Sequence, residues 1–256
     1  MTAAPPILDT AARAALAELL LSIADDEFVI GFWDSEWTGI APMLEEDVAT
    51  SSIAQDEIGH AKAFYELLAE LTDDDPDRIA YGRSADAFRH ATLLNHSRGD
   101  WAFSVARRYL YETADAVRLA ALARSSHEPL ALLAAKMRRE ETYHLLHADA
   151  WLRRLADGAG RQRLIQAIVR LWPDAQDLFA PLAGEEKLVR DGLLPEPMAV
   201  MHRTWQANVR PVLDLVVEAL PDAAPSSNGR TRRSEDFAWL HGEMTSVVRS
   251  EEAATW

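Results

Sequence analysis

The chain has 256 residues, 48% of them hydrophobic, which fits one large globular domain with a full core. The absence of cysteine excludes disulfides, thiolate metal sites and iron–sulfur clusters, and it agrees with a reducing cytoplasm. A formal net charge of -15 argues against nucleic acid or an anionic membrane surface as a partner. The sequence shows no signal-peptide pattern and no apolar run that could span a bilayer, so we expect a cytoplasmic protein.

Apolar residues recur at helical spacing along almost the whole chain. The first predicted helix starts after a cap at Asp9 or Thr10. Further helices are predicted over residues of about 42–71, 85–94, 100–124, 129–155, 161–171, 197–220 and 235–251. No run of alternating apolar residues demands a strand. Four long helices with short connections indicate an all-α, ferritin-like four-helix bundle with additional C-terminal helices.

We expect residues 1–256 to form a single ferritin-like domain. Its bundle core would cover residues of about 9–157, and the extra helices would cover about 160–253. The segment PDAAPSSNGRTRR, residues 221–233, is rich in Pro, Ser and Arg, which is typical of a solvated and mobile connector.

A Glu-x-x-His motif occurs twice, each time in a long predicted helix. The first copy, EIGH, carries Glu57 and His60, and the second, ETYH, carries Glu141 and His144. Residues three apart lie on one face of a helix, so each pair could ligate one metal ion. Taken alone, a single Glu-x-x-His is more often an exposed pair on a helix surface.

A further glutamate precedes each motif by nearly the same number of residues: Glu27 before the first copy and Glu112 before the second. The helix–loop–helix unit is therefore repeated with its acids in register. Glu27 falls on an apolar stripe, where a carboxylate needs a partner such as a cation. Glu112 is less clear, because Arg108 and Asp115 lie one turn to either side of it.

Four carboxylates and two imidazoles from four helices are the ligand set of a di-iron or di-manganese carboxylate bundle. The predicted metal ligands and catalytic residues are Glu27, Glu57, His60, Glu112, Glu141 and His144. Asp56 and Glu140 directly precede the motif acids. We predict that these two hydrogen-bond the outer N–H of a ligand histidine, with simple solvation of the helix as the alternative.

Several segments resemble the polypeptides of bacterial phenylacetyl-CoA epoxidase, the oxygenase of aerobic phenylacetate degradation. QDEIGHAKAFY and REETYH resemble the ligand helices of its catalytic A subunit. EWTGIAPMLEEDVA, YHLLHADAWLRRL, IQAIVRLWPDAQDLF and a last helix ending in Trp256 resemble its C subunit. The best-known C subunits resemble a metal-free scaffold that lacks several ligands, whereas this sequence has all six. The chain thus resembles the C subunit in outline and the A subunit at the site.

The resemblance implies a di-iron oxygenase component that activates O2 to oxidise an aromatic or acyl-CoA substrate. Glu57 and Glu141 would bridge two iron ions, with a manganese–iron pair as the alternative, and Glu27 and Glu112 would be terminal ligands. Because the chain has neither cysteine nor a G-x-G-x-x-G loop, we expect it to bind no iron–sulfur cluster, flavin or NAD. Its electrons would then come from a separate reductase.

The resemblance also implies paralogous oxygenase subunits as partners, in a homodimer or heterodimer. Two other functions stay open. One is a non-catalytic structural subunit of such a complex, and the other is a ferritin-like iron oxidase or peroxidase without an organic substrate. The long stretch of chain after His144 exceeds what iron storage requires, which disfavours the last of these.

Overall fold

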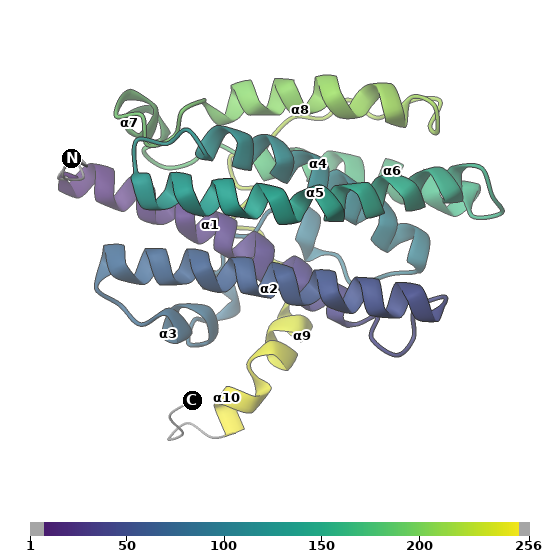
Figure 1. Cartoon of the computed structure of the whole chain (residues 1–256), viewed down its shortest axis with the longest axis horizontal. Helices are drawn as coiled ribbons and strands as arrows, with labels where there is room; N and C mark the ends of the chain where they lie inside the picture. The colour runs from purple at the N-terminus through teal and green to yellow at the C-terminus, as the bar shows by residue number, and fades with distance from the viewer. Residues whose placement is uncertain (1–7, 251–256) are drawn as a thin grey trace. The chain divides into compact units, whose positions relative to one another are not determined.

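The computed structural model describes residues 8–250, and these contain helices and no strand (Figure 1). The predicted all-α class is confirmed and is consistent with a ferritin-like bundle. The described residues form two compact units, one of residues 8–19 and 100–229, the other of residues 20–99 and 230–250. Whether residues 1–256 fold as a single domain stays a prediction.

The first unit is built around one central helix. Its main helices are α4 (Trp101–Leu122), α5 (Glu128–Ala156), α6 (Arg161–Ala175) and α8 (Met198–Leu213), with a short α7 (Glu185–Arg190). Helix α4 packs against α5, α6 and α8. The side chain of Asp100, the residue before its first turn, caps it by accepting the N–H of Phe103. On α8, the Trp205 Nε1–H donates to Thr113 Oγ1 of α4 over 2.9 Å.

The second unit contains the C-terminal part of α1 (Thr10–Ser35), α2 (Leu44–Thr72), α3 (Pro76–Tyr81), α9 (Glu235–Met244) and α10 (Ser246–Ser250). Helix α1 approaches α2 closely at Gly31. A Cβ atom at Gly31 would lie 2.9 Å from Cγ1 of Ile58 and 3.1 Å from Cβ of Glu57. Only glycine allows this approach, so this contact sets the spacing of the two helices beside Glu57.

The predicted helix over residues 85–94 is wrong. This stretch has only two 3-10 turns, Ala85–Ala87 and Thr92–Asn95. Between them, two backbone N–H groups bind carboxylates of α1: Arg89 N donates to Asp25 Oδ2 over 2.6 Å, and Ala91 N donates to Asp26 Oδ1 over 2.8 Å. Because these N–H groups are used in tertiary contacts, they are not available to the hydrogen bonds of a helix.

Helix α3 lies between the predicted helices over 42–71 and 85–94, where the sequence analysis predicts no helix. Asp75 caps this helix and Pro76 occupies its first turn, which is a regular helix start. The short α7 was not predicted either. The helix predicted over 197–220 ends early, at Leu213. Beyond that end, the Arg161 guanidinium donates to the carbonyl of Val216 over 3.2 Å.

The helix predicted over 235–251 is divided into α9 and α10 at Thr245. Its predicted end at Glu251, and the helix end expected at Trp256, lie outside the described residues. Residues 221–233 contain no helix, as predicted, but Arg230 within them is buried. Mobility of this connector stays a prediction. Among the helices within residues 8–250, none combines the length and apolar character that crossing a membrane requires.

Candidate metal centre

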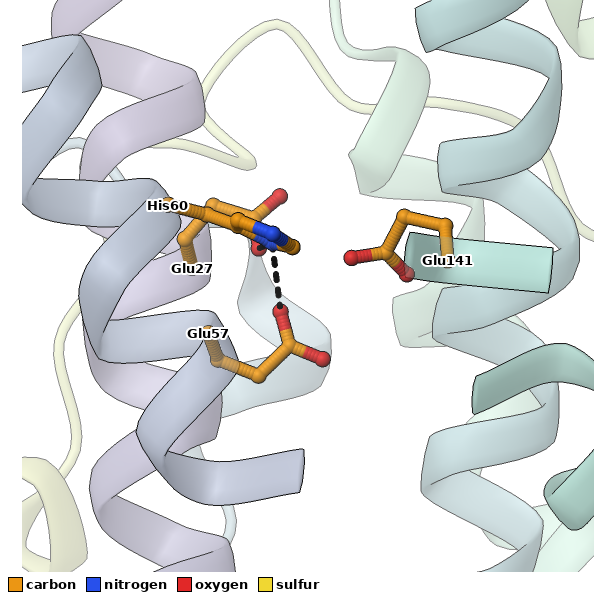
Figure 2. A group of neighbouring side chains, drawn as sticks. All are labelled: Glu27, Glu57, His60 and Glu141. Carbon is orange, nitrogen blue, oxygen red and sulfur yellow. Dashed lines mark ion pairs between the residues drawn. The ribbon is translucent and has the colours of Figure 1, made fainter. Parts of the chain in front are cut away.

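Three of the predicted ligands meet in the second unit, and we call them the α1–α2 cluster: Glu27 of α1 with Glu57 and His60 of α2. All three side chains are buried. The Nδ1 atom of His60 lies 3.8 Å from Oε2 of Glu57 and 3.9 Å from Oε2 of Glu27 (Figure 2). The helical spacing of Glu57 and His60 places them on one face of α2. The close approach at Gly31 brings the Glu27 carboxylate to the same point.

The other three predicted ligands meet in the first unit, and we call them the α4–α5 cluster: Glu112 of α4 with Glu141 and His144 of α5. These side chains are buried too. The Nδ1 atom of His144 lies 3.3 Å from Oε2 of Glu141. One turn before Glu112, the buried guanidinium of Arg108 forms an ion pair with the Glu112 carboxylate. A cation of the protein is therefore part of this cluster.

The carboxylates of the α4–α5 cluster raise the pKa of the His144 imidazole. Burial by itself lowers the pKa of His144, but the hydrogen bond to Glu141 and the charge of Glu112 outweigh it. The net result is a pKa above the ordinary value for histidine.

The donor set of each cluster fits a transition metal ion. In each cluster, one ligand atom from each of the three residues lies within 4.8 Å of the others. Each cluster offers two carboxylates and one imidazole, a combination that suits iron and manganese. Buried acids also need a compensating cation, which a metal ion supplies. The structure thus assembles the six predicted residues as two sets of three, and the prediction that the two sets share bridging carboxylates stays a prediction.

The two acids that precede the motif glutamates differ in exposure. Asp56 lies on the exposed face of α2, and Glu140 is partly buried on α5. Their predicted hydrogen bonds to the ligand histidines stay a prediction.

A buried network beside Glu27 was not predicted. The Tyr65 hydroxyl donates to Asp25 Oδ1 over 2.6 Å, and burial together with the Asp25 charge raises the pKa of Tyr65 well above its ordinary value. Asp26 forms an ion pair of 3.1 Å with Arg230. Both acids are fully buried. The signal in the sequence was the run Asp25–Asp26–Glu27 inside an otherwise apolar helix.

A cavity of about 380 Å³ opens in the first unit between α4, α5 and α8. Thr113 and Leu145 are among its lining residues, and they directly follow the cluster residues Glu112 and His144 in the chain. Arg124 and Glu196, which form an ion pair, line it as well. Its size falls in the range of small-molecule sites.

Residues 1–256 match the family described as phenylacetic acid catabolic protein. The chain belongs to this family. It is 31% identical over 197 residues to the C subunit of 1,2-phenylacetyl-CoA epoxidase from Escherichia coli K12, covering 76% of this chain and 79% of that relative. It is also 29% identical over 163 residues to the A subunit of the same enzyme from that organism, covering 62% of this chain and 52% of that relative. The predicted resemblance to both is confirmed, and it supports an oxygenase-type role.

Proposed function

We propose that this chain is a di-iron oxygenase component of the phenylacetyl-CoA epoxidase type. The observation that carries the proposal is the repetition of one donor set, two buried glutamates and a histidine, in the α1–α2 cluster and again in the α4–α5 cluster. Membership of the phenylacetic acid catabolic family supports the same function. The substrate class would be an aromatic or acyl-CoA compound.

Each cluster would hold one metal ion in this proposal. The α1–α2 cluster contributes Glu27, Glu57 and His60, and the α4–α5 cluster contributes Glu112, Glu141 and His144. When bound, the pair of iron ions supplies the redox chemistry that activates O2. The histidines bind as neutral imidazoles, the carboxylates balance the metal charge, and the burial of all six side chains keeps bulk water away. Since the chain has no cysteine for an iron–sulfur relay, electrons come from a separate reductase.

The organic substrate would enter the cavity between α4, α5 and α8. Five of its lining residues give it apolar surface that suits an aromatic or acyl group: Ala116, Val117, Ala120, Ala121 and Leu145. Changing Ala120, which lines it, to Trp should fill the space. We expect that variant to keep its metal and lose substrate oxidation, measured with phenylacetyl-CoA and the reductase. Unchanged oxidation would remove the cavity from the proposal, and metal-dependent O2 consumption that needs no organic substrate would favour the ferritin-like oxidase.

A second candidate function is that of a non-catalytic structural component. The match to the C subunit is favourable to it, because it covers more of both chains than the match to the A subunit does. In either role we expect paralogous oxygenase subunits as partners, in a homodimer or heterodimer. Light scattering of the purified chain, alone and with a paralogous partner, measures this. A strict monomer in both samples would count against it.

Metal analysis separates the two functions. After anaerobic addition of Fe(II), the oxygenase proposal expects close to two metal ions per chain. If Glu57 and Glu141 are bridging ligands, changing either to Ala should lose more metal than changing Glu27 or Glu112, because a bridging carboxylate serves both ions. A chain that binds no iron, or Glu57→Ala and Glu141→Ala variants that bind as much as the parent, would leave the structural function.

A further inference from the structure

A second cavity opens in the second unit, where α3 packs against α2 (Figure 1). We call it the α2–α3 cavity. Its volume is about 280 Å³, and its lining residues come from α1, α2 and α3, all within that unit. It shares no lining residue with the cavity between α4, α5 and α8.

Three aromatic side chains line the α2–α3 cavity: Phe28, Tyr65 and Tyr81. The ring centroid of Phe28 lies 5.7 Å from that of Tyr65 and 5.3 Å from that of Tyr81. The ring planes meet at 84° and 77°, so both pairs are edge-to-face. This is one of the arrangements in which aromatic rings attract one another. A further ring in the cavity could pack against these three in the same way.

The shape of the cavity is set before a ligand enters. The Tyr65 hydroxyl donates to Asp25 over 2.6 Å, and the Arg83 guanidinium donates to the same hydroxyl oxygen over 3.2 Å. These buried contacts fix the Tyr65 ring, and a site that is already ordered loses little conformational freedom on binding. At Gly59, which also lines the cavity, a Cβ atom would lie in open space.

Two side chains of opposite charge line the cavity as well, Lys62 and Asp77. Lys62 lies 3.8 Å from Glu66 in an exposed ion pair, so its charge is shared with that acid. Asp77 lies near the Tyr81 phenol: burial first, and then the charge of Asp77, raises the pKa of Tyr81. A carboxylate at this place accepts a hydrogen bond from an uncharged donor and repels an anion.

The volume limits the ligand to one ring. A cavity of about 150 Å³ is enough for benzene, so 280 Å³ leaves room for a small substituent. We propose that the α2–α3 cavity binds an uncharged single-ring aromatic alcohol. Its ring packs against Phe28, Tyr65 and Tyr81, and its hydroxyl donates to Asp77. This site goes beyond the proposed function, since it needs neither a metal ion nor the cavity between α4, α5 and α8.

NMR titration of the whole chain, labelled at the isoleucine methyl groups, tests the proposal. The Ile58 methyl group reports on this cavity because Ile58 lines it, and Ile58→Val assigns its resonance. Benzyl alcohol should bind more tightly than its saturated analogue cyclohexylmethanol by about 2- to 10-fold, the range expected for aromatic pairs. It should also bind more tightly than benzoate, and Asp77→Asn should narrow that difference because it removes the repelling charge.

Variants of the wall locate the ligand. Gly59→Leu places a side chain in the open space and should weaken the binding of benzyl alcohol by about 10-fold or more, since both cannot occupy it. Ala120→Trp is the matched control, because it fills the other cavity and should leave the Ile58 titration unchanged. Tyr81→Leu removes one ring and should weaken the binding of benzyl alcohol more than that of cyclohexylmethanol.

Should Gly59→Leu fail to fold, Ala80→Leu fills the cavity from α3. An Ile58 methyl group that does not respond to benzyl alcohol would overturn this inference. So would equal binding of benzyl alcohol and cyclohexylmethanol, or binding that the filled variants leave unchanged. Each of these results leaves the proposed function intact. Metal analysis that finds no iron would overturn the proposed function and leave this inference intact.

Discussion

Adding one methyl group at Gly31 tests whether the spacing of α1 and α2 sets the geometry of the α1–α2 cluster. In Gly31→Ala the new Cβ would lie 2.9 Å from Cγ1 of Ile58, 3.1 Å from the carbonyl oxygen of Ala54 and 3.1 Å from Cβ of Glu57. The Ile58 side chain can rotate away. The other two atoms are fixed to the α2 backbone, so the helices must move apart at Glu57.

The magnitude follows from two opposing terms. Alanine is favoured over glycine in a helix by about 0.5–1 kcal/mol. Overpacking a close contact costs about 1–3 kcal/mol. Gly59 isolates the first term, because a Cβ there meets no atom within 4 Å. Gly59→Ala should therefore gain helix stability, and Gly31→Ala should be less stable than Gly59→Ala by about 1–3 kcal/mol, the overpacking term alone.

Urea denaturation of the two variants and the parent, followed by circular dichroism, measures this difference. Metal titration provides the second measurement. Gly31→Ala should bind metal more weakly at the α1–α2 cluster, since Glu57 moves with the α2 backbone, while Gly59→Ala should leave binding unchanged. If Gly31→Ala proves as stable as Gly59→Ala and binds metal like the parent, the close approach does not set the site.

Three further outcomes are expected. Arg230→Ala removes the ion-pair partner of the buried Asp26 and should lower the free energy of unfolding, measured by urea denaturation, by about 3–5 kcal/mol. A loss below about 1 kcal/mol would show that the protein does not need this pair. Asp75→Ala removes the side chain that accepts the N–H of Arg78 at the start of α3, and it should lower the free energy of unfolding by about 1 kcal/mol. An unchanged urea midpoint would show that this cap does not stabilise the protein. Fe(II) added without oxygen should raise the melting temperature of the parent, with a smaller rise in His60→Ala; equal rises would mean that the α1–α2 cluster is not the site.

The long helices could be predicted because their signals are local. Periodic apolar residues run through each of them, and Asp9 and Asp100 cap α1 and α4 by accepting backbone N–H groups three residues ahead. Such signals depend only on neighbours in the chain. The structure of residues 85–94 depends instead on contacts with distant parts of the chain. Its N–H groups bind Asp25 and Asp26, which lie more than sixty positions earlier in the chain, and no local pattern encodes that pairing.

The pairs within each Glu-x-x-His motif could be predicted for the same local reason, because three positions along a helix always share a face. Arg108 shows the limit of this reasoning. An arginine four residues before a glutamate reads the same in sequence whether the pair is solvated on a surface or buried. The contribution of the ion pair to the free energy of folding differs greatly between a surface and a buried site. The structure supplies that missing information, since both Arg108 and Glu112 are buried.

Burial alone does not distinguish a predicted metal ligand from a structural acid, since this protein buries both the predicted ligand glutamates and the acids that pair with arginines. Asp26 and Asp115 are fixed by the guanidinium groups of arginines, at 3.1 and 2.8 Å, and a carboxylate held in this way has its charge compensated by the protein. Glu57 and Glu141 instead face imidazoles, at 3.8 and 3.3 Å. An imidazole is itself a metal ligand, so a carboxylate placed against it could share a bound cation with it. Glu112 is next to both an arginine and a histidine-containing cluster. In the proposed function it is therefore the carboxylate at which the protein's own cation and a metal ion would compete.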